Sequence, residues 1–210
     1  MTDATDFPST DAFFVQTFAG SPLMAILRSA GVDRAVRVAT TAWDLGLDSV
    51  EVTIQSDADV DALREVARLG RERGAVVGAG TIVSPDQVPV AVAAGAGYLV
   101  SPGLDGDVVR AAHAAGIPIL PGVATPSEVQ QAVALGLTWL KAFPAQWLGA
   151  DWFRHIRGPF PQVRFIATGG MDAANAGAFL DAGVRVVAVG SALEDESQLE
   201  QLAALLAARR

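Results

Sequence analysis

The 210-residue chain has no cysteine and only two histidines, His113 and His155. Without cysteine, disulfides and thiolate metal sites are excluded. The two histidines lie far apart in the sequence, so a metal site would have to consist mostly of carboxylates. We therefore expect a metal-free, cytoplasmic protein. Both histidines fall in helix-like segments and are interpreted as surface residues.

Long apolar runs and basic clusters are also missing. The longest uncharged run, residues 87–104, contains two prolines, three glycines and a serine, so no membrane span is predicted. The first eleven residues have neither the basic region nor the apolar region of a signal peptide. The net charge is −8 and the basic residues are scattered, which disfavours a nucleic-acid partner. Hydrophobic residues reach 51% against 18% charged, which favours a layered α/β core or a protomer that buries further surface in an oligomer.

One residue type is scarce in an informative way. Fourteen of the fifteen basic side chains are arginine, and the single lysine is Lys141. Of the two side chains, only the lysine amine can lose its proton and attack a carbonyl. Its location in the fold decides whether the presence of a single lysine reflects chance or a chemical role.

Short apolar runs alternate with segments of helical period, and each repeat spans roughly 20 to 27 residues, which suits one strand plus one helix. Helix boundaries are legible between the runs, as in the capping box that begins at Thr125. Eight such units predict an α/β protein of the (β/α)8 TIM-barrel type, with residues 1–210 as one domain. Residues 10–19 predict a short extra N-terminal helix that covers the bottom of the barrel. The eight predicted strands are Met24–Arg28, Ser49–Ile54, Val76–Thr81, Tyr98–Pro102, Pro118–Gly122, Leu140–Pro144, Arg164–Gly169 and Val186–Ser191.

Side-chain alternation places two ionisable groups inside the barrel. If Val50, Val52 and Ile54 face the helices, then Glu51 faces the lumen with Ser49, Thr53 and Gln55. The same reasoning turns Lys141 inward with Trp139 and Phe143. A purely structural ion pair is the plain interpretation, but buried ion pairs stabilise poorly because desolvation opposes the attraction. The functional interpretation is a desolvated, nucleophilic amine with a carboxylate nearby that moves protons.

The ends of the last two predicted strands are rich in glycine. Gly169 and Gly170 follow one strand, and Gly190 and Ser191 follow the next. Loops at these positions of a TIM barrel commonly bind phosphate through backbone N–H groups. Tight turns are the alternative for either pair alone. Arg28 could contact a carboxylate or phosphate, with a solvated rim charge as its alternative. The hydroxyl of Thr81 could contact a carboxylate.

These strand ends resemble the 2-keto-3-deoxy-6-phosphogluconate (KDPG) aldolase family, in the broad sense that includes 2-keto-3-deoxy-6-phosphogalactonate and 4-hydroxy-2-oxoglutarate aldolases. The resemblance covers nearly the whole chain. It rests on Glu51-Val-Thr53, Gly78-Ala-Gly-Thr81, Ser101-Pro-Gly103, Pro121-Gly122, Lys141-Ala-Phe-Pro144, Thr168-Gly-Gly170 and Gly190-Ser191.

The resemblance implies a class I aldolase that needs no cofactor and acts on a small-molecule keto acid. It implies that Lys141 forms a Schiff base with the keto acid and that Glu51 moves protons. A homotrimer is also implied. The implied substrate contacts are Thr81, Pro102 and Phe143 around the pyruvyl group, and Gly169, Gly170, Gly190 and Ser191 around the phosphate.

One position departs from the family pattern. Many phosphogluconate-type members carry arginine two residues after the threonine of the Glu51-Val-Thr53 motif, where this chain has Gln55. Arg28 resembles the arginine that other members, including the phosphogalactonate branch, place at the end of the first strand. The preferred sugar acid and the need for phosphate therefore stay open.

Two other functions share parts of this pattern. A phosphate-binding barrel isomerase or epimerase would use the glycine loops without an imine lysine. A sugar-phosphate binding protein of the same fold would need neither the lysine nor the glutamate. Borohydride trapping with pyruvate separates the aldolase from the epimerase, and measured pyruvate release separates it from the binding protein.

Overall fold

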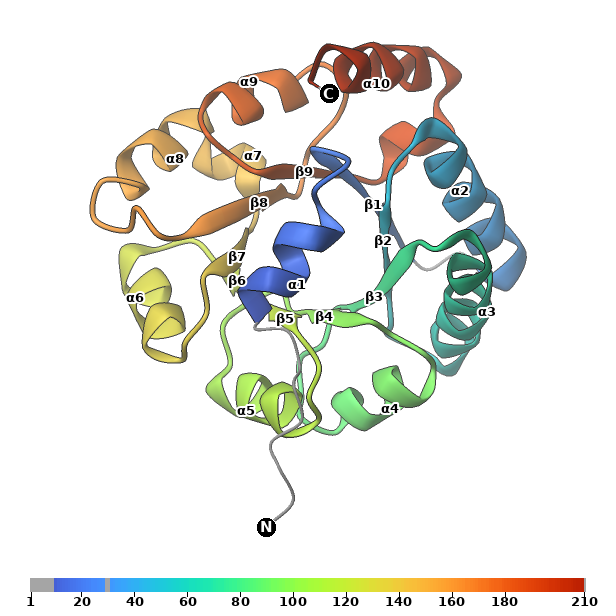
Figure 1. The fold of residues 1–210 in the computed structure, drawn as a ribbon, viewed down its shortest axis with the longest axis horizontal. Coiled ribbons are helices and arrows are strands. Elements are labelled where there is room, and N and C mark those ends of the chain that lie inside the picture. The colour runs from blue at the N-terminus through green and yellow to red at the C-terminus, as the bar shows by residue number, and fades with distance from the viewer. Residues whose placement is uncertain (1–9, 29–30, 210) are drawn as a thin grey trace.

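The computed structural model describes residues 10–28 and 31–209. Nine parallel strands form one sheet in the order β5-β4-β3-β2-β1-β9-β8-β7-β6. The sheet curls into a ring with helices around it, so the TIM-barrel prediction is confirmed (Figure 1). The strands are β1 (Leu23–Leu27), β2 (Ser49–Thr53), β3 (Val76–Gly80), β4 (Tyr98–Val100), β5 (Ile119–Leu120), β6 (Gly122–Val123), β7 (Trp139–Ala142), β8 (Arg164–Thr168) and β9 (Val186–Val189).

The ninth strand arises because the predicted fifth strand is interrupted at Pro121. Proline has no N–H to donate to a ladder, so the strand divides into β5 and β6. β5 pairs with β4, β6 pairs with β7, and the Pro121 carbonyl accepts a hydrogen bond from the Lys141 N–H at 2.9 Å. Residues 119–123 therefore close the barrel as one bent strand. The prediction of eight strand–helix repeats is consistent with this arrangement.

The helices begin and end largely where the sequence indicates. Thr125 caps α6 in a capping box with Glu128, as predicted. Gly74 ends α3 with a positive φ of 71°, a conformation that costs glycine little. The helices are α1 (Thr10–Thr17), α2 (Gly31–Leu45), α3 (Asp57–Arg73), α4 (Gln87–Ala93), α5 (Gly106–Ala114), α6 (Pro126–Ala134), α7 (Ala145–Leu148), α8 (Ala150–Ile156), α9 (Ala176–Asp181) and α10 (Glu196–Arg209), with a 3-10 turn η1 (Ser191–Glu194).

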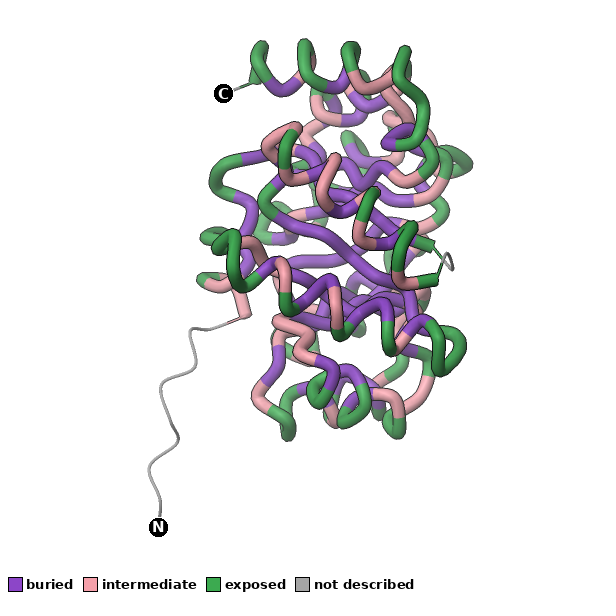
Figure 2. The backbone as a smooth tube through the Cα atoms, turned by 90° about the vertical axis from the view of Figure 1, so that its right-hand side faces the viewer, coloured by how far each residue is buried: buried purple, intermediate pink, exposed green. Residues whose placement is uncertain are grey.

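Two separate apolar clusters follow from side-chain alternation on the strands. The larger lies between sheet and helices and includes Val50, Val52 and Leu140. The smaller fills the lumen and includes Trp139 and Ile166. The buried backbone accordingly forms a central layer, and exposed residues occupy the outer helix faces (Figure 2). The predicted assignment of alternate residues to lumen and helix layer is confirmed.

Helix α1 crosses the end of the barrel at which the strands begin (Figure 1). The ring of Phe14 meets Tyr98 edge-on at 5.7 Å between centroids, and Phe18 lies 5.5 Å from Trp139. Tyr98 and Trp139 are the first residues of β4 and β7. The predicted N-terminal helix is therefore present and closes the bottom, which leaves the opposite end as the open mouth.

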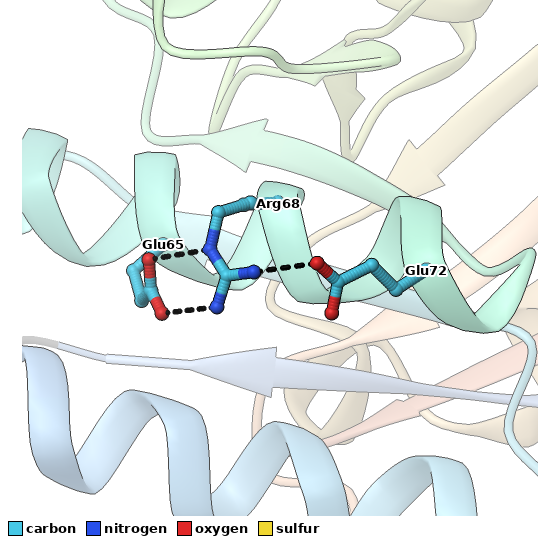
Figure 3. A network of polar contacts seen from close by, with 3 residues as sticks. All are labelled: Glu65, Arg68 and Glu72. Carbon is cyan, nitrogen blue, oxygen red and sulfur yellow. Dashed lines mark hydrogen bonds and ion pairs between the residues drawn. The ribbon is translucent and has the colours of Figure 1, made fainter.

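The helix surfaces carry exposed charge networks that add little to stability, because solvent screens them. On α3, Arg68 binds Glu65 at 2.8 Å and Glu72 at 2.6 Å (Figure 3). His113 and His155 are both exposed, as expected. Among the described residues, no helix is long and apolar enough to cross a membrane.

Candidate active site

The lone lysine and the lumen glutamate face each other inside the barrel. Lys141 on β7 places its Nζ 3.7 Å from Oε1 of Glu51 on β2. Their side chains are only 10% and 1% exposed, respectively. The distance allows an ion pair but exceeds a good hydrogen bond, and both carboxylate oxygens lack a hydrogen-bond donor within the described chain. A buried carboxylate without fixed donors is poorly compensated, which is unusual unless it has a chemical task.

The glycine motif on β3 makes room for this carboxylate. A Cβ on Gly80 would lie 2.0 Å from Oε1 of Glu51, so any other residue here would force the carboxylate out of this position. β2 and β3 pair with Thr53 opposite Gly80, so the glutamate leans across the neighbouring strand. The sequence shows the glycine, and the structure supplies its reason.

A cavity of about 200 Å³ opens above the pair. The Phe143 ring stands beside it, with its centroid 5.4 Å from Nζ of Lys141. The structure thus brings together all of the predicted pyruvyl-site residues, and adds Ile26. The cavity is lined by Ile26, Arg28, Glu51, Thr53, Gln55, Thr81, Pro102, Lys141 and Phe143.

Thr81 enters this cavity in an unusual backbone conformation. Its φ is +64°, and it is the only residue other than glycine with a positive φ in the described part of the chain. For a β-branched residue the left-handed region is sterically costly. Such strain persists where the surroundings impose it, and it clusters at functional sites. Nothing in the sequence reveals this conformation.

A second cavity of about 350 Å³ lies beside the first and shares Ile26 and Arg28 with it. It contains the glycine loops after β8 and β9. Arg28 is exposed at the junction, and Arg28 and Lys141 are the only cationic side chains lining these two cavities. The second cavity is lined by Ile26, Arg28, Gln146, Gly169, Gly170, Met171, Asp172, Ala188, Gly190 and Ser191.

Backbone geometry holds the loop after β8 open toward this cavity. Gly169 and Gly170 have φ values of 92° and 76°. The Gly169 carbonyl accepts a hydrogen bond from the Gln146 N–H at 3.1 Å, and Asn175 Nδ2 donates to the Gly170 carbonyl at 2.8 Å. Both carbonyls of the glycine pair are therefore engaged in hydrogen bonds within the protein.

Sequence reasoning missed Gln146, which covers Gly170. A Cβ on Gly170 would lie 2.0 Å from Oε1 of Gln146. The side chain is exposed on α7 and lines the second cavity. The only signal in the sequence was its position a few residues after Lys141, in the short helix that follows the same strand, and this does not show that it covers Gly170.

An ion pair stands beside Ser191 at the rim. Arg34 on α2 donates to both carboxylate oxygens of Glu194, at 2.8 and 2.7 Å. The guanidinium holds the pKa of the Glu194 carboxyl below its usual value, mainly through these hydrogen bonds. The pair ties η1, which begins at Ser191, to the outer helix.

Two features elsewhere offer no competing site. Another cavity, about 670 Å³, lies at the closed end beside Phe13 and Pro118, and His113 is the only titratable side chain that lines it. Within residues 10–28 and 31–209, no group of three or more His, Cys, Asp or Glu side chains could hold a metal ion.

Comparison with known proteins agrees with this geometry. Residues 16–206 match the family model described as KDPG and KHG aldolase. The KHG/KDPG aldolase of Escherichia coli K12 is 37% identical over 155 residues, 73% of this chain and 72% of that protein. The 2-dehydro-3-deoxy-6-phosphogalactonate aldolase of the same organism is 30% identical over 173 residues, 82% of this chain and 84% of that one.

A solved structure gives the same result. The KDPG aldolase of Legionella pneumophila, with pyruvate captured as a covalent carbinolamine intermediate, superposes with a TM-score of 0.79. It is 30% identical, and the match covers 91% of this chain and 95% of that one. Fold, site and relatives together define a class I pyruvate-dependent aldolase, a carbon–carbon lyase. The chain belongs to the KDPG and KHG aldolase family.

Proposed function

We propose that this enzyme reversibly cleaves a 2-keto-3-deoxy sugar-acid 6-phosphate to pyruvate and glyceraldehyde 3-phosphate through an imine on Lys141. One observation carries the proposal. The only lysine of the chain lies nearly buried at the barrel mouth, 3.7 Å from an otherwise unpartnered glutamate. The carbinolamine that the Legionella relative forms with pyruvate supports the same chemistry here.

The reaction follows from these two groups. The neutral Lys141 amine adds to the C2 carbonyl, and the carbinolamine loses water to give an iminium ion. Glu51 accepts the proton of the C4 hydroxyl, the C3–C4 bond breaks, and its electron pair moves into the iminium to form an enamine as the aldehyde leaves. A proton is then delivered to C3, and water releases pyruvate and regenerates the amine. Glu51 suits the proton transfers because no described residue holds its oxygens by a hydrogen bond.

The two cavities divide the substrate between them. We assign the pyruvyl end to the cavity with Thr81, Pro102 and Phe143, next to the reacting amine. We assign the phosphate to the second cavity, where the two glycine loops and Ser191 lie. A substrate that spans both cavities would pass Arg28 at their junction.

The charge of Arg28 becomes more important for substrate binding because Gln55 occupies the position where many phosphogluconate-type members have arginine. Gln55 lines the pyruvyl cavity and is exposed, and it brings no charge. Apart from Lys141, Arg28 is then the only cationic side chain among the described residues that line the two cavities, so it is the group we expect to neutralise the carboxylate or the phosphate. We expect phosphate-bearing substrates to depend strongly on this side chain.

The direct test is pyruvate release, measured side by side with three substrates: the gluconate-derived and galactonate-derived 6-phosphates and 4-hydroxy-2-oxoglutarate. Cleavage of at least one phosphorylated substrate, with kcat/KM well above that for 4-hydroxy-2-oxoglutarate, is the expected result. If none of the three substrates releases pyruvate and borohydride traps no pyruvate adduct, the proposed reaction is contradicted. Epimerase-type chemistry would then be favoured.

We also propose a homotrimer, as the family resemblance implies. Several large apolar side chains are exposed on the single chain, among them Trp147 at 88% and Val83 at 57%. Apolar groups of this size are usually covered when an oligomer forms. Size-exclusion chromatography with light scattering should give three times the 21.7 kDa chain mass. A concentration-independent monomer would contradict the trimer.

A further inference from the structure

The side chain of Asn175 turns away from the helix that it precedes. Asn175 is the N-cap residue of α9, a position where a side-chain oxygen usually accepts a hydrogen bond from the first turn, yet it makes no such bond. Its Nδ2 instead donates to the Gly170 carbonyl at 2.8 Å, five residues back in the loop after β8. Helix capping therefore does not explain this half-buried side chain.

Asp172 binds the N–H groups of this turn in its place. Its Oδ1 accepts hydrogen bonds from the N–H groups of Ala174 and Asn175, at 3.0 and 2.9 Å. In return, the Asp172 N–H donates to Asn175 Oδ1 at 3.1 Å. The amide of Asn175 is thus held at both ends, at Oδ1 by Asp172 and at Nδ2 by Gly170. A side chain fixed in this way can fix the peptide that it binds.

The peptide between Gly170 and Met171 needs such a partner. Gly170 has a φ of 76°, and glycine adopts many other conformations at little cost, so this peptide could rotate easily. In a trans peptide the carbonyl and the following N–H point in opposite directions. The hydrogen bond from Asn175 to the Gly170 carbonyl therefore also sets the direction of the Met171 N–H, which points away from Asn175.

The N–H groups of this loop lie beside the second cavity, which Gly170 and Met171 both line. The preceding peptide is fixed in the same manner, because the Gln146 N–H binds the Gly169 carbonyl at 3.1 Å. No residue of the described chain accepts a hydrogen bond from the N–H of Gly170 or of Met171. Successive backbone donors that are not used within the protein suit an anion.

We propose that Asn175 is a positioning residue for phosphate binding: by holding the Gly170 carbonyl, it keeps the Met171 N–H directed at the anion in the second cavity. This inference rests on the proposed function, which assigns the substrate phosphate to that cavity. Nδ2 of Asn175 is engaged by Gly170, so the side chain acts through the loop and not by touching the substrate. It affects binding of the phosphate and not the reacting atoms near Lys141.

The first test is Asn175→Ala, which removes the amide without adding a charge. KM for a phosphorylated substrate should rise roughly tenfold, equivalent to about 1.4 kcal/mol and within the contribution of one hydrogen bond. Both kcat and the KM for 4-hydroxy-2-oxoglutarate should change less than about twofold, because the pyruvyl cavity is untouched.

Thr125→Ala is the matched control. It removes the side-chain oxygen that accepts a hydrogen bond from the Glu128 N–H at 3.3 Å, in the loop after β6. A lost side chain–backbone hydrogen bond in another loop should leave both KM values unchanged. Equal changes in KM for phosphorylated and unphosphorylated substrates in Asn175→Ala would overturn the proposal.

Binding of inorganic phosphate supplies a readout independent of turnover. Isothermal titration calorimetry in a phosphate-free buffer should give a Kd roughly tenfold higher for Asn175→Ala than for the wild type, and a wild-type Kd for Thr125→Ala. This measurement decides the inference even for an enzyme that cleaves none of the three substrates.

The calorimetry separates two kinds of failure. If the wild type and Asn175→Ala bind inorganic phosphate equally well, and the variant only unfolds at a lower temperature, Asn175 has a structural role alone. The positioning proposal is then overturned while the phosphate site stands. If the wild type binds no phosphate, the assignment of the second cavity is itself contradicted, and the inference falls with it.

A second measurement uses the wild-type protein. Asn175 is the only asparagine of the chain, so labelling with ¹⁵N-asparagine gives a single side-chain amide in the NMR spectrum. Phosphate bound to the Met171 N–H should polarise the peptide and strengthen the bond to Asn175, which shifts the Nδ2 signal. Pyruvate, assigned to the other cavity, should leave this signal in place. A signal unmoved by saturating inorganic phosphate would overturn the proposal even if Asn175→Ala does not fold.

Discussion

Lys141 Nζ lies 3.7 Å from Oε1 of Glu51, and the two residues come from β7 and β2, which are separated in the sheet by three other strands. The two side chains thus meet across the lumen. An amine and a carboxylate at this separation in a nearly closed site interact strongly, yet a substrate atom or a water can still enter between them. The predictions below follow from this relationship and from the cavities above it.

Lys141→Arg separates charge from nucleophilicity. Arginine keeps the positive charge opposite Glu51 but stays protonated, so it cannot form an imine. We expect a folded variant with no pyruvate adduct after borohydride reduction and no measurable aldol cleavage. In the wild type, peptide mapping should locate one adduct at Lys141, because it is the only lysine. Near-normal cleavage by the variant would refute the Schiff-base mechanism.

Glu51→Gln keeps the shape of the side chain and removes its proton-transfer ability. We expect kcat to fall by roughly 10²- to 10⁴-fold, the usual contribution of general acid–base catalysis. Imine formation with pyruvate should slow but remain detectable by borohydride trapping. Normal turnover with a lowered unfolding temperature would instead show that the glutamate serves only as an ion-pair partner.

Gly170→Val should weaken phosphate binding. A Cβ there would meet Gln146 at 2.0 Å, and the positive φ of 76° adds backbone strain. We expect KM for phosphorylated substrates to rise far more than KM for 4-hydroxy-2-oxoglutarate. Gly136→Val is the matched control, because Gly136 has a φ of 82°, ends a helix, and has no atom within 4 Å of the added Cβ. Equal effects on both substrates, or equal effects of both variants, would count against a phosphate site at Gly170.

Thr81→Gly should relieve strain and reduce activity together. Glycine adopts a φ of +64° without the steric cost that threonine bears, so the unfolding temperature should rise or stay level. Loss of the hydroxyl and methyl from the pyruvyl cavity should raise KM several-fold. Calorimetry and steady-state kinetics on the same preparation check both halves. A destabilised variant with unchanged KM would show that Thr81 is needed only for the fold.

Chelation should leave catalysis intact. In the proposed mechanism an iminium supplies the electron sink that a metal provides in other aldolases, so retro-aldol activity is expected to survive EDTA. The assay is pyruvate release before and after dialysis against the chelator. Loss of activity that a divalent ion restores would exclude a purely imine-based reaction.

Most of the fold could be predicted from local sequence patterns. Alternation along β2 was sufficient to place Val50 toward the helices and Glu51 in the lumen, because the side-chain period of a strand is two wherever one face is buried. The break at Pro121 was not anticipated, although its cause is local. The proline lacks an N–H, and the ladder divides there.

The sequence was enough to predict which residues belong to the candidate site, but not how those residues are arranged. The lysine, the glutamate and the glycine loops could be located by strand ends alone, since the carboxyl ends of barrel strands converge at one mouth. Gln146 over Gly170 and the left-handed Thr81 could not, because each depends on how a loop packs against strands distant in sequence.

By itself, then, the sequence determined the periodic features of this protein: roughly where each strand lies, which face its side chains take, and that its one lysine points into the lumen. Only the tertiary structure decided the distances: the 3.7 Å between Lys141 and Glu51, and the space that Gly80 leaves for that carboxylate. The physical reason is that alternation is a property of each strand alone. Separations across a lumen depend on how the closed sheet is staggered and packed, which no single strand encodes.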